Sequence, residues 1–355
     1  MRRLTFGVAL MLLITACGDD ATLETDAPSA TGDTTASAAP TVATTVAAPT
    51  SAVPISPSAG CVASSEVVTG TSKRELESAG LNRGYVLSVP EGHDRSAAVP
   101  LVIGFHGYTE RASDFFNSTN FGELGEDKGF ITAVPEGRGD VQRWLFELDE
   151  TDVDISMNNP DIAFVADLVD GISSELCIDS GRIYATGFSN GGWITSAVAC
   201  TLSERFAAVA PVSGIMDFGG DCQPEESVPM VTFHGTNDPY EPFDGGVENA
   251  VSRSLLPADI DGNFYDLPLI ENPILDLGVI EKVALWAERN GCDANPSEEA
   301  ISGSVSRWSY DCAVSASVVF YQIDGGIHRW PPRLGGTPNV GASEVIWSFF
   351  SAHAK

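Results

Sequence analysis

Two hydrophobic patterns alternate along the chain from about Gly60 onward. Short, continuous apolar runs bounded by glycine or proline are typical of buried strands, and they occur at residues 85–89, 100–107, 130–137, 182–186, 206–212, 229–234 and 317–323. Runs with apolar residues three and four positions apart are typical of amphipathic helices, and they occur at residues 161–176, 192–201, 277–290 and 342–352.

This alternation predicts an α/β fold. Strands that are apolar throughout indicate a mainly parallel sheet covered by helices on both faces. Ligands bind to such sheets beyond the carboxyl ends of the strands. Several motifs are predicted to stand at that edge: His106-Gly107, residues 135–137, Ser189, Ser213-Gly214, His234-Gly235 and residues 324–328.

The first residues have the pattern of an export signal. Arg2 and Arg3 precede an apolar run, residues 6–14, that is too short to span a bilayer. The run ends in "ITAC", which resembles a bacterial lipobox and predicts a signal peptide over residues 1–17 with lipidation of Cys17. The alternative is ordinary cleavage next to an incidental cysteine. Either way the protein is expected outside the cytoplasm, as a cell-surface lipoprotein whose only membrane contact is its lipid anchor, or as a secreted protein.

Residues 18–59 are predicted to form a disordered tether. Of the 38 residues from 21 to 58, 29 are Ala, Thr, Ser or Pro. Such a segment buries too little apolar surface to offset the entropy lost on ordering. Residues 60–355 are then expected to form one catalytic domain, and we expect a monomer.

Charge excludes one class of partner. The chain has 49 acidic and 19 basic residues, a net charge of −30, whereas a nucleic-acid-binding protein has the opposite balance. The acidic stretches raise calcium binding as an alternative, but they lack the D-x-D-x-D-G spacing of a calcium loop.

Six cysteines remain besides Cys17, and an even number outside the cytoplasm predicts three disulfides. They are Cys61, Cys177, Cys200, Cys222, Cys292 and Cys312, for which fifteen pairings are possible. Because there is no C-x-x-C motif and no histidine cluster, we expect no metal site, and nothing in the sequence implies a cofactor.

The segment "GFSNG", residues 187–191, matches the G-x-S-x-G pattern of a serine nucleophile. A serine on a sharp strand-to-helix turn projects its hydroxyl above the sheet, and glycines two positions away on each side relieve the crowding. The predicted strand before Ser189 and helix after it fit this arrangement. The alternative is a glycine-rich turn with no chemical role.

A serine hydroxyl needs a base, and the chain has five histidines. His93 lies in a predicted surface turn, His353 is two residues from the C-terminus, and His106 and His234 end strands before a glycine. The order Ser, acid, His along the chain, which this type of fold uses, leaves His328 in "GGIHRWP".

The acid that orients His328 should follow a late strand. Asp238 in "HGTNDP" fits, while Asp217 and Asp244 are the alternatives. Asp238 could instead serve only an Asx turn. For the oxyanion we expect the backbone N–H groups of Asn190 and Tyr108.

Three tryptophans stand close to these motifs in the sequence and are candidates for holding a ring of the substrate: Trp144, Trp193 and Trp330. The alternative is that they belong to the core or to the walls of the site.

The motifs "FHGYTE", "ATGFSNGGW", "FAAVAPVSG", "FHGTNDP", "WAERNGC" and "GGIHRWPP" stand in one order. Together they resemble the secreted polyhydroxybutyrate depolymerase, feruloyl esterase and acetylxylan esterase group of α/β-hydrolases, over residues 85–350. The resemblance implies the α/β-hydrolase fold, a triad of Ser189, Asp238 and His328, and a Cys292–Cys312 disulfide. For the other cysteines we expect Cys177–Cys200 at the bottom of the sheet and Cys61–Cys222 near its top.

The chain departs from this group in an acidic insert, residues 241–272, which we expect to shape the entrance to the site. The expected function is that of an extracytoplasmic serine esterase acting through an acyl-enzyme. Its substrate would be a polyester oligomer or an acylated plant polysaccharide fragment. The alternatives are a serine peptidase of the same fold and a catalytically silent cell-wall binding protein.

Overall fold

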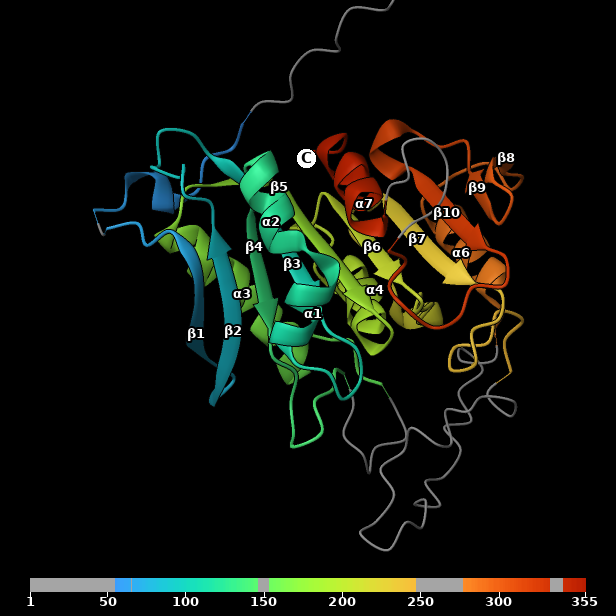
Figure 1. Cartoon of the computed structure of the whole chain (residues 1–355), viewed down its shortest axis with the longest axis horizontal. Coiled ribbons are helices and arrows are strands. Elements are labelled where there is room, and N and C mark those ends of the chain that lie inside the picture. Colours follow the sequence, from blue (N-terminus) through green and yellow to red (C-terminus); the bar gives the residue numbers. More distant parts are fainter. Residues whose placement is uncertain (1–54, 65, 146–152, 247–276, 333–340) are drawn as a thin grey trace, which may run out of the picture. The chain divides into compact units, whose positions relative to one another are not determined.

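A computed structural model describes residues 55–64, 66–145, 153–246, 277–332 and 341–355 (Figure 1). The predicted signal peptide, Cys17, most of the tether and most of the acidic insert lie outside these residues. Within the described ranges, no helix is long and apolar enough to cross a membrane.

A ten-stranded sheet runs through the described residues, in the order β1-β2-β4-β3-β5-β6-β7-β10-β9-β8. The six strands from β4 to β10 in this order are parallel, whereas β1 and β2 at one edge and β9 and β8 at the other pair antiparallel (Figure 1). The strands are β1 (Gly70–Ser78), β2 (Leu81–Val89), β3 (Val99–Phe105), β4 (Ile131–Pro135), β5 (Ile178–Phe188), β6 (Ala208–Val212), β7 (Met230–Gly235), β8 (Ser297–Ser302), β9 (Val305–Ser309) and β10 (Val318–Ile323).

Helices cover both faces of this sheet, and each face has its own apolar cluster. One face carries α3 (Pro160–Glu175), α4 (Asn190–Thr201) and α6 (Val279–Arg289). The other carries α1 (Ala112–Thr119), α2 (Phe121–Lys128) and α7 (Ala342–Ser351). Short 3-10 turns lie at η1 (Ala59–Val62), η2 (Gly219–Asp221) and η4 (Val314–Ala316). The predicted α/β fold class is therefore confirmed.

The sequence pattern did not predict the outer strands. In β1, partly buried and exposed side chains alternate, and its sequence "GTSKRELES" is polar almost throughout. The first four side chains of β8 are exposed. An edge strand with one solvated face contributes few apolar residues to the core, so its sequence looks like that of a loop.

Two of the three predicted disulfide pairings are wrong. The structure pairs Cys61 with Cys177 and Cys200 with Cys222, in place of Cys177–Cys200 and Cys61–Cys222. The Cys292–Cys312 pair that the resemblance implied is present. The error came from the position of the segment before Cys61, which lies beside the amino end of β5 and not near the active-site edge.

Residues 55–59, expected in the tether, pack on the domain. The N–H of Ser58 donates to the carbonyl of Ile178 at 2.8 Å, and the N–H of Ser56 donates to the carboxylate of Asp179 at 3.0 Å. At Gly60, an added Cβ would lie 2.1 Å from the carbonyl oxygen of Leu176, so only glycine fits there. The folded unit therefore begins before residue 60.

Candidate active site

Ser189 lies on a strained turn between β5 and α4. Its φ of 55° and ψ of −122° fall in a region that non-glycine residues rarely adopt. The backbone is crowded on both sides of this turn: an added Cβ at Gly187 would lie 2.1 Å from the carbonyl oxygen of Gly191. At Gly191 it would lie 2.2 Å from the carbonyl oxygen of Phe105. Both glycines of the G-x-S-x-G pattern are therefore required by close backbone contact.

A third glycine supports the same turn from the next strand. An added Cβ at Gly214, just after β6, would lie 2.1 Å from the carbonyl oxygen of Ser189. The Ser189 N–H donates to the carbonyl of Val212 at 2.9 Å. The turn thus packs between the ends of β3 and β6, and the Ser189 residue retains 9% of its accessible surface.

His328 and Asp238 meet at the same edge of the sheet. The loop after β10 carries His328 and the turn after β7 carries Asp238, and Nδ1 of His328 donates to Oδ2 of Asp238 at 2.7 Å. The aromatic rings of Phe188 and Tyr240 lie 4.8 Å and 5.1 Å from the imidazole, measured between centroids. These contacts hold the imidazole in one orientation, with Nδ1 committed to the carboxylate.

The backbone fixes the Asp238 carboxylate. Its Oδ1 accepts the N–H groups of Tyr240 and Glu241, both at 2.9 Å. Burial by itself would raise the pKa of Asp238. The hydrogen bond from His328 and the charges of His328 and His234 outweigh burial, so the pKa is lowered from its usual value.

Neither alternative acid is placed like Asp238. Asp217 is buried, ion-paired with Arg289 at 3.1 Å, and accepts the N–H of Gly219 at 2.6 Å. Asp244 is exposed and makes no contact with His328 among the described residues. Of the three candidate acids, only Asp238 forms a hydrogen bond with His328.

Two other histidines at this edge are buried and have structural partners. In His106, Nδ1 donates to the carbonyl of Gly107 at 2.8 Å, and Nε2 accepts the N–H of Gly137 at 2.9 Å. In His234, Nε2 donates to the carbonyl of Glu241 at 2.8 Å. Burial lowers the pKa of both, that of His234 to about 4, so both imidazoles are neutral near pH 7.

The loop after β3 and the start of α4 present two backbone donors. The N–H groups of Tyr108 and Asn190 have no hydrogen-bond acceptor within the described residues. The side chain of Asn190 does not cap its helix. Its Oδ1 accepts the N–H of Trp144 at 2.8 Å, and its Nδ2 donates to the carbonyl of Trp144 at 3.2 Å.

The three candidate tryptophans differ in their surroundings. Trp144 is fully buried, and its Nε1 donates to the carbonyl of His106 at 2.9 Å, so the prediction that its ring contacts substrate is wrong. Trp193 and Trp330 are partly buried. Their Nε1 atoms donate to Glu241 at 2.9 Å and to Ser343 at 3.1 Å. Both indole N–H groups therefore serve contacts inside the protein.

Sequence reasoning missed two ionisable residues that influence each other electrostatically, Glu241 and Lys282, of which Glu241 donates its backbone N–H to Asp238. Burial raises the pKa of Glu241 and lowers that of Lys282, and each charge partly offsets the effect on the other. Lys282 retains 5% of its accessible surface. The available signal was weak: Lys282 is one of only four lysines, and it stands on the apolar face of its helix.

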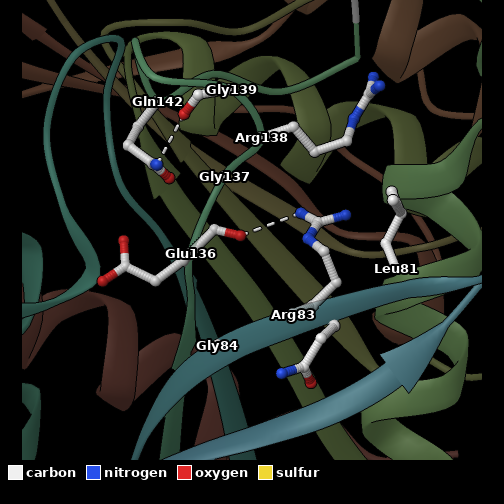
Figure 2. A pocket seen from close by; sticks show the side chains of 9 residues that line it. Leu81, Arg83, Gly84, Glu136, Gly137, Arg138, Gly139 and Gln142 are labelled. Atoms are coloured by element: carbon white, nitrogen blue, oxygen red, sulfur yellow. Dashed lines mark hydrogen bonds between the residues drawn. The ribbon is translucent and has the colours of Figure 1, made fainter.

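A hollow of about 460 Å³ lies beside the loop that follows β4 (Figure 2). Polar and charged side chains line it together with Leu81 and three glycines, and Arg83 donates to the carbonyl of Glu136 at 2.9 Å. Asp161 pairs with both Arg83, at 2.9 Å, and Arg138, at 3.0 Å. Gly137 lines the hollow and donates its N–H to Nε2 of His106. The charged groups of the hollow stabilise the loop and do not include any of the predicted site residues.

No group of three or more His, Cys, Asp or Glu side chains in the described part of the chain is placed to hold a metal ion.

Several known proteins are similar to this chain. The sequence model of the prolyl oligopeptidase family matches residues 118–243, about a third of the chain, which include Ser189 and Asp238. Feruloyl esterase B of Piromyces equi is 28% identical over 253 residues, which are 69% of this chain and 42% of that protein. Feruloyl esterase C of Emericella nidulans is 27% identical over 296 residues, 80% of this chain and 90% of that protein.

One solved structure of the same fold is an acetyl xylan esterase from Aspergillus awamori, with a TM-score of 0.54 and 17% identity, covering 79% of this chain and 99% of that one. The chain spans less than half the length of the first two curated relatives, 42% and 35%. The protein therefore has the α/β-hydrolase fold and resembles, in sequence, the feruloyl and acetylxylan esterase group.

Proposed function

We propose that the protein is an extracytoplasmic serine esterase in which Ser189, His328 and Asp238 form the triad. The observation that carries the proposal is the strained turn of Ser189 at the sheet edge where His328 donates to Asp238 at 2.7 Å. The similarity to feruloyl esterases supports the reaction class. A serine on such a turn, with a base oriented by a buried carboxylate, is the arrangement that acyl transfer requires.

In the proposed reaction, the Ser189 hydroxyl attacks the ester carbonyl and Nε2 of His328 takes its proton. Asp238 holds the imidazole in the tautomer with Nδ1 protonated and stabilises the imidazolium that forms. The N–H groups of Tyr108 and Asn190 stabilise the oxyanion. The alcohol leaves with the proton from His328, and water then hydrolyses the acyl-enzyme by the same steps.

The proposed substrates are carboxylic esters of acylated plant polysaccharides, with polyhydroxybutyrate oligomers as the second class. The names of the relatives favour the first class. The three disulfides fit an oxidising compartment outside the cytoplasm. We further propose that Cys17 is lipidated. A Cys17→Ser variant should then leave the membrane fraction while retaining its esterase activity.

The experiment that tests the proposal uses the full chain and a fluorophosphonate probe together with p-nitrophenyl acetate and methyl ferulate. Wild type should be labelled and should hydrolyse at least one ester. Ser189→Ala should lose labelling and lower kcat by about 10⁴-fold or more. Retention of full activity in Ser189→Ala would contradict the assignment.

A serine peptidase of the same fold is the second candidate, and the match to the prolyl oligopeptidase family favours it. Ester and peptide substrates with the same acyl group separate the two functions. A higher kcat/KM for the peptide amide than for the matched ester would support the peptidase.

A further inference from the structure

The loop between β3 and α1, residues 106–110, is closed on itself by one carboxylate. Oε2 of Glu110 accepts the N–H of Gly107 at 2.8 Å, and the N–H of Glu110 donates back to the carbonyl of Gly107 at 3.2 Å. Within this turn Thr109 has a φ of 68°, and its N–H donates to the carbonyl of Gln142 at 2.9 Å. The turn is therefore held at both ends and at its middle.

These bonds leave one N–H of the turn without an acceptor. Among residues 107–110, the N–H groups of Gly107, Thr109 and Glu110 are all taken, and that of Tyr108 has no partner within the described residues. If Glu110 did not accept the N–H of Gly107, the adjacent N–H groups of Gly107 and Tyr108 would both be unpaired. The loop could then rotate and present either group to the oxyanion. The carboxylate thus determines which N–H the loop presents.

Glu110 also lies close to the reacting groups. An added Cβ at Gly107 would lie 3.1 Å from Oε2 of Glu110 and 3.2 Å from Cδ1 of Phe188, the residue before Ser189. The ring of Phe188 is in turn 4.8 Å from that of His328. The pKa of Glu110 is raised above its usual value, because burial and the charge of Asp114 outweigh the opposing effects of the bond from Gly107 and the charge of His328.

We propose that Glu110 is a positioning residue for ester hydrolysis: its carboxylate holds Gly107 so that the Tyr108 N–H faces the oxyanion. This inference rests on the proposed function. A charge-assisted hydrogen bond is stronger than a neutral one, and a donor that is already oriented needs no reorganisation when the oxyanion forms. The reaction contains no step on Glu110 itself.

The test compares Glu110→Ala with Glu110→Gln, using Asp114→Asn as the matched control. Asp114 lies in the first turn of α1 and accepts the N–H of Arg111; among the described residues it forms no hydrogen bond with residues 107–110, and it acts on Glu110 only through its charge. Removal of an oxyanion donor costs 10²–10³-fold in kcat, and a donor that is merely misplaced should cost less. We expect about a 30-fold lower kcat in Glu110→Ala with KM changed less than about 3-fold.

The amide oxygen of glutamine still accepts the Gly107 N–H, so Glu110→Gln should recover kcat to within about 5-fold of wild type. Asp114→Asn should stay within about 2-fold. A phenylboronic acid, which forms a tetrahedral adduct with the serine, should bind Glu110→Ala more weakly by the same factor as kcat/KM falls.

Three results would overturn the inference: a kcat within 3-fold of wild type in Glu110→Ala, unchanged boronic acid affinity, or no recovery in Glu110→Gln. If Glu110→Ala does not fold, as judged by circular dichroism, Glu110→Asp serves in its place, because its shorter side chain cannot reach Gly107 in the same way. Failure of the proposed function is distinguishable, since wild type would then hydrolyse no ester.

Discussion

His234 and His328 both approach the same oxygen of Asp238, yet their surroundings differ. Nε2 of His234 lies 3.5 Å from Oδ2, and Nδ1 of His328 lies 2.7 Å from it. The His234 side chain is 2% exposed and sits in a strand, whereas that of His328 is 10% exposed and sits in a loop. Burial lowers the pKa of His234 to about 4, despite the neighbouring carboxylate.

The difference shows that a nearby carboxylate does not by itself make a histidine a base. Desolvation disfavours the imidazolium, and it outweighs the attraction of Asp238 at His234. The side chain of His328 keeps contact with solvent, whereas that of His234 is enclosed. We expect experiments on the two histidines to separate a catalytic role from a structural one.

The largest expected difference is in turnover. His328→Gln should lower kcat for p-nitrophenyl acetate by about 10⁴–10⁶-fold, because the serine loses its base. His234→Gln keeps an N–H donor for the carbonyl of Glu241 and should lower kcat by less than about 10-fold. Equal losses in the two variants would show that His234 also takes part in turnover.

A second prediction concerns the pH dependence of stability. The folded-state pKa of His234, about 4, lies below its unfolded value of about 6.5. The stability that comes from keeping it neutral is therefore present above pH 6.5 and is lost as pH falls toward 4. The full loss amounts to about 3 kcal/mol.

Urea unfolding at pH 7, 6, 5 and 4 measures this loss. His234→Gln should lose about 3 kcal/mol less than wild type over that range, since it has no imidazole to protonate. Acid losses from groups whose pKa does not depend on His234 occur in both proteins and cancel in the difference. Parallel curves for the two proteins would show that His234 titrates normally in the fold.

The smallest expected effect concerns Trp144, whose indole N–H donates to the backbone carbonyl of His106, the third histidine at this edge. Trp144→Phe removes the indole N–H that donates to the carbonyl of His106 but keeps the ring against Phe105. The free energy of unfolding should fall by about 1–2 kcal/mol, because the carbonyl loses a buried donor. Activity should fall about 3-fold, because His106 adjoins the loop whose Tyr108 N–H we propose as an oxyanion donor. A loss of more than about 100-fold would mean that Trp144 takes part more directly than its burial suggests.

The sequence predicted the central sheet and the helices that pack on it, because their apolar runs are long and regular. It also singled out Ser189, Asp238 and His328 from the order of motifs along the chain, and the structure places His328 and Asp238 in hydrogen-bond contact.

What the sequence could not provide depends on packing between distant segments. Trp144 stands next to an acidic stretch of the sequence, but its burial follows from contacts with His106, just after β3, and Asn190, at the start of α4. The pairing of Cys61 depends on where the N-terminal segment crosses the sheet. Glu110 and Glu241 carry no motif of their own, and only the hydrogen bonds they accept reveal what they hold.

The Cys61–Cys177 disulfide has a consequence for how the protein meets its substrate. It fastens the chain's entry into the folded unit to the amino end of β5, whereas Ser189 follows the carboxyl end of that strand. At about 3.3 Å per residue, the two ends of β5 are roughly 30 Å apart. The chain therefore enters the folded unit at the edge of the sheet opposite to Ser189, and a substrate approaching the serine arrives from the side away from that entry.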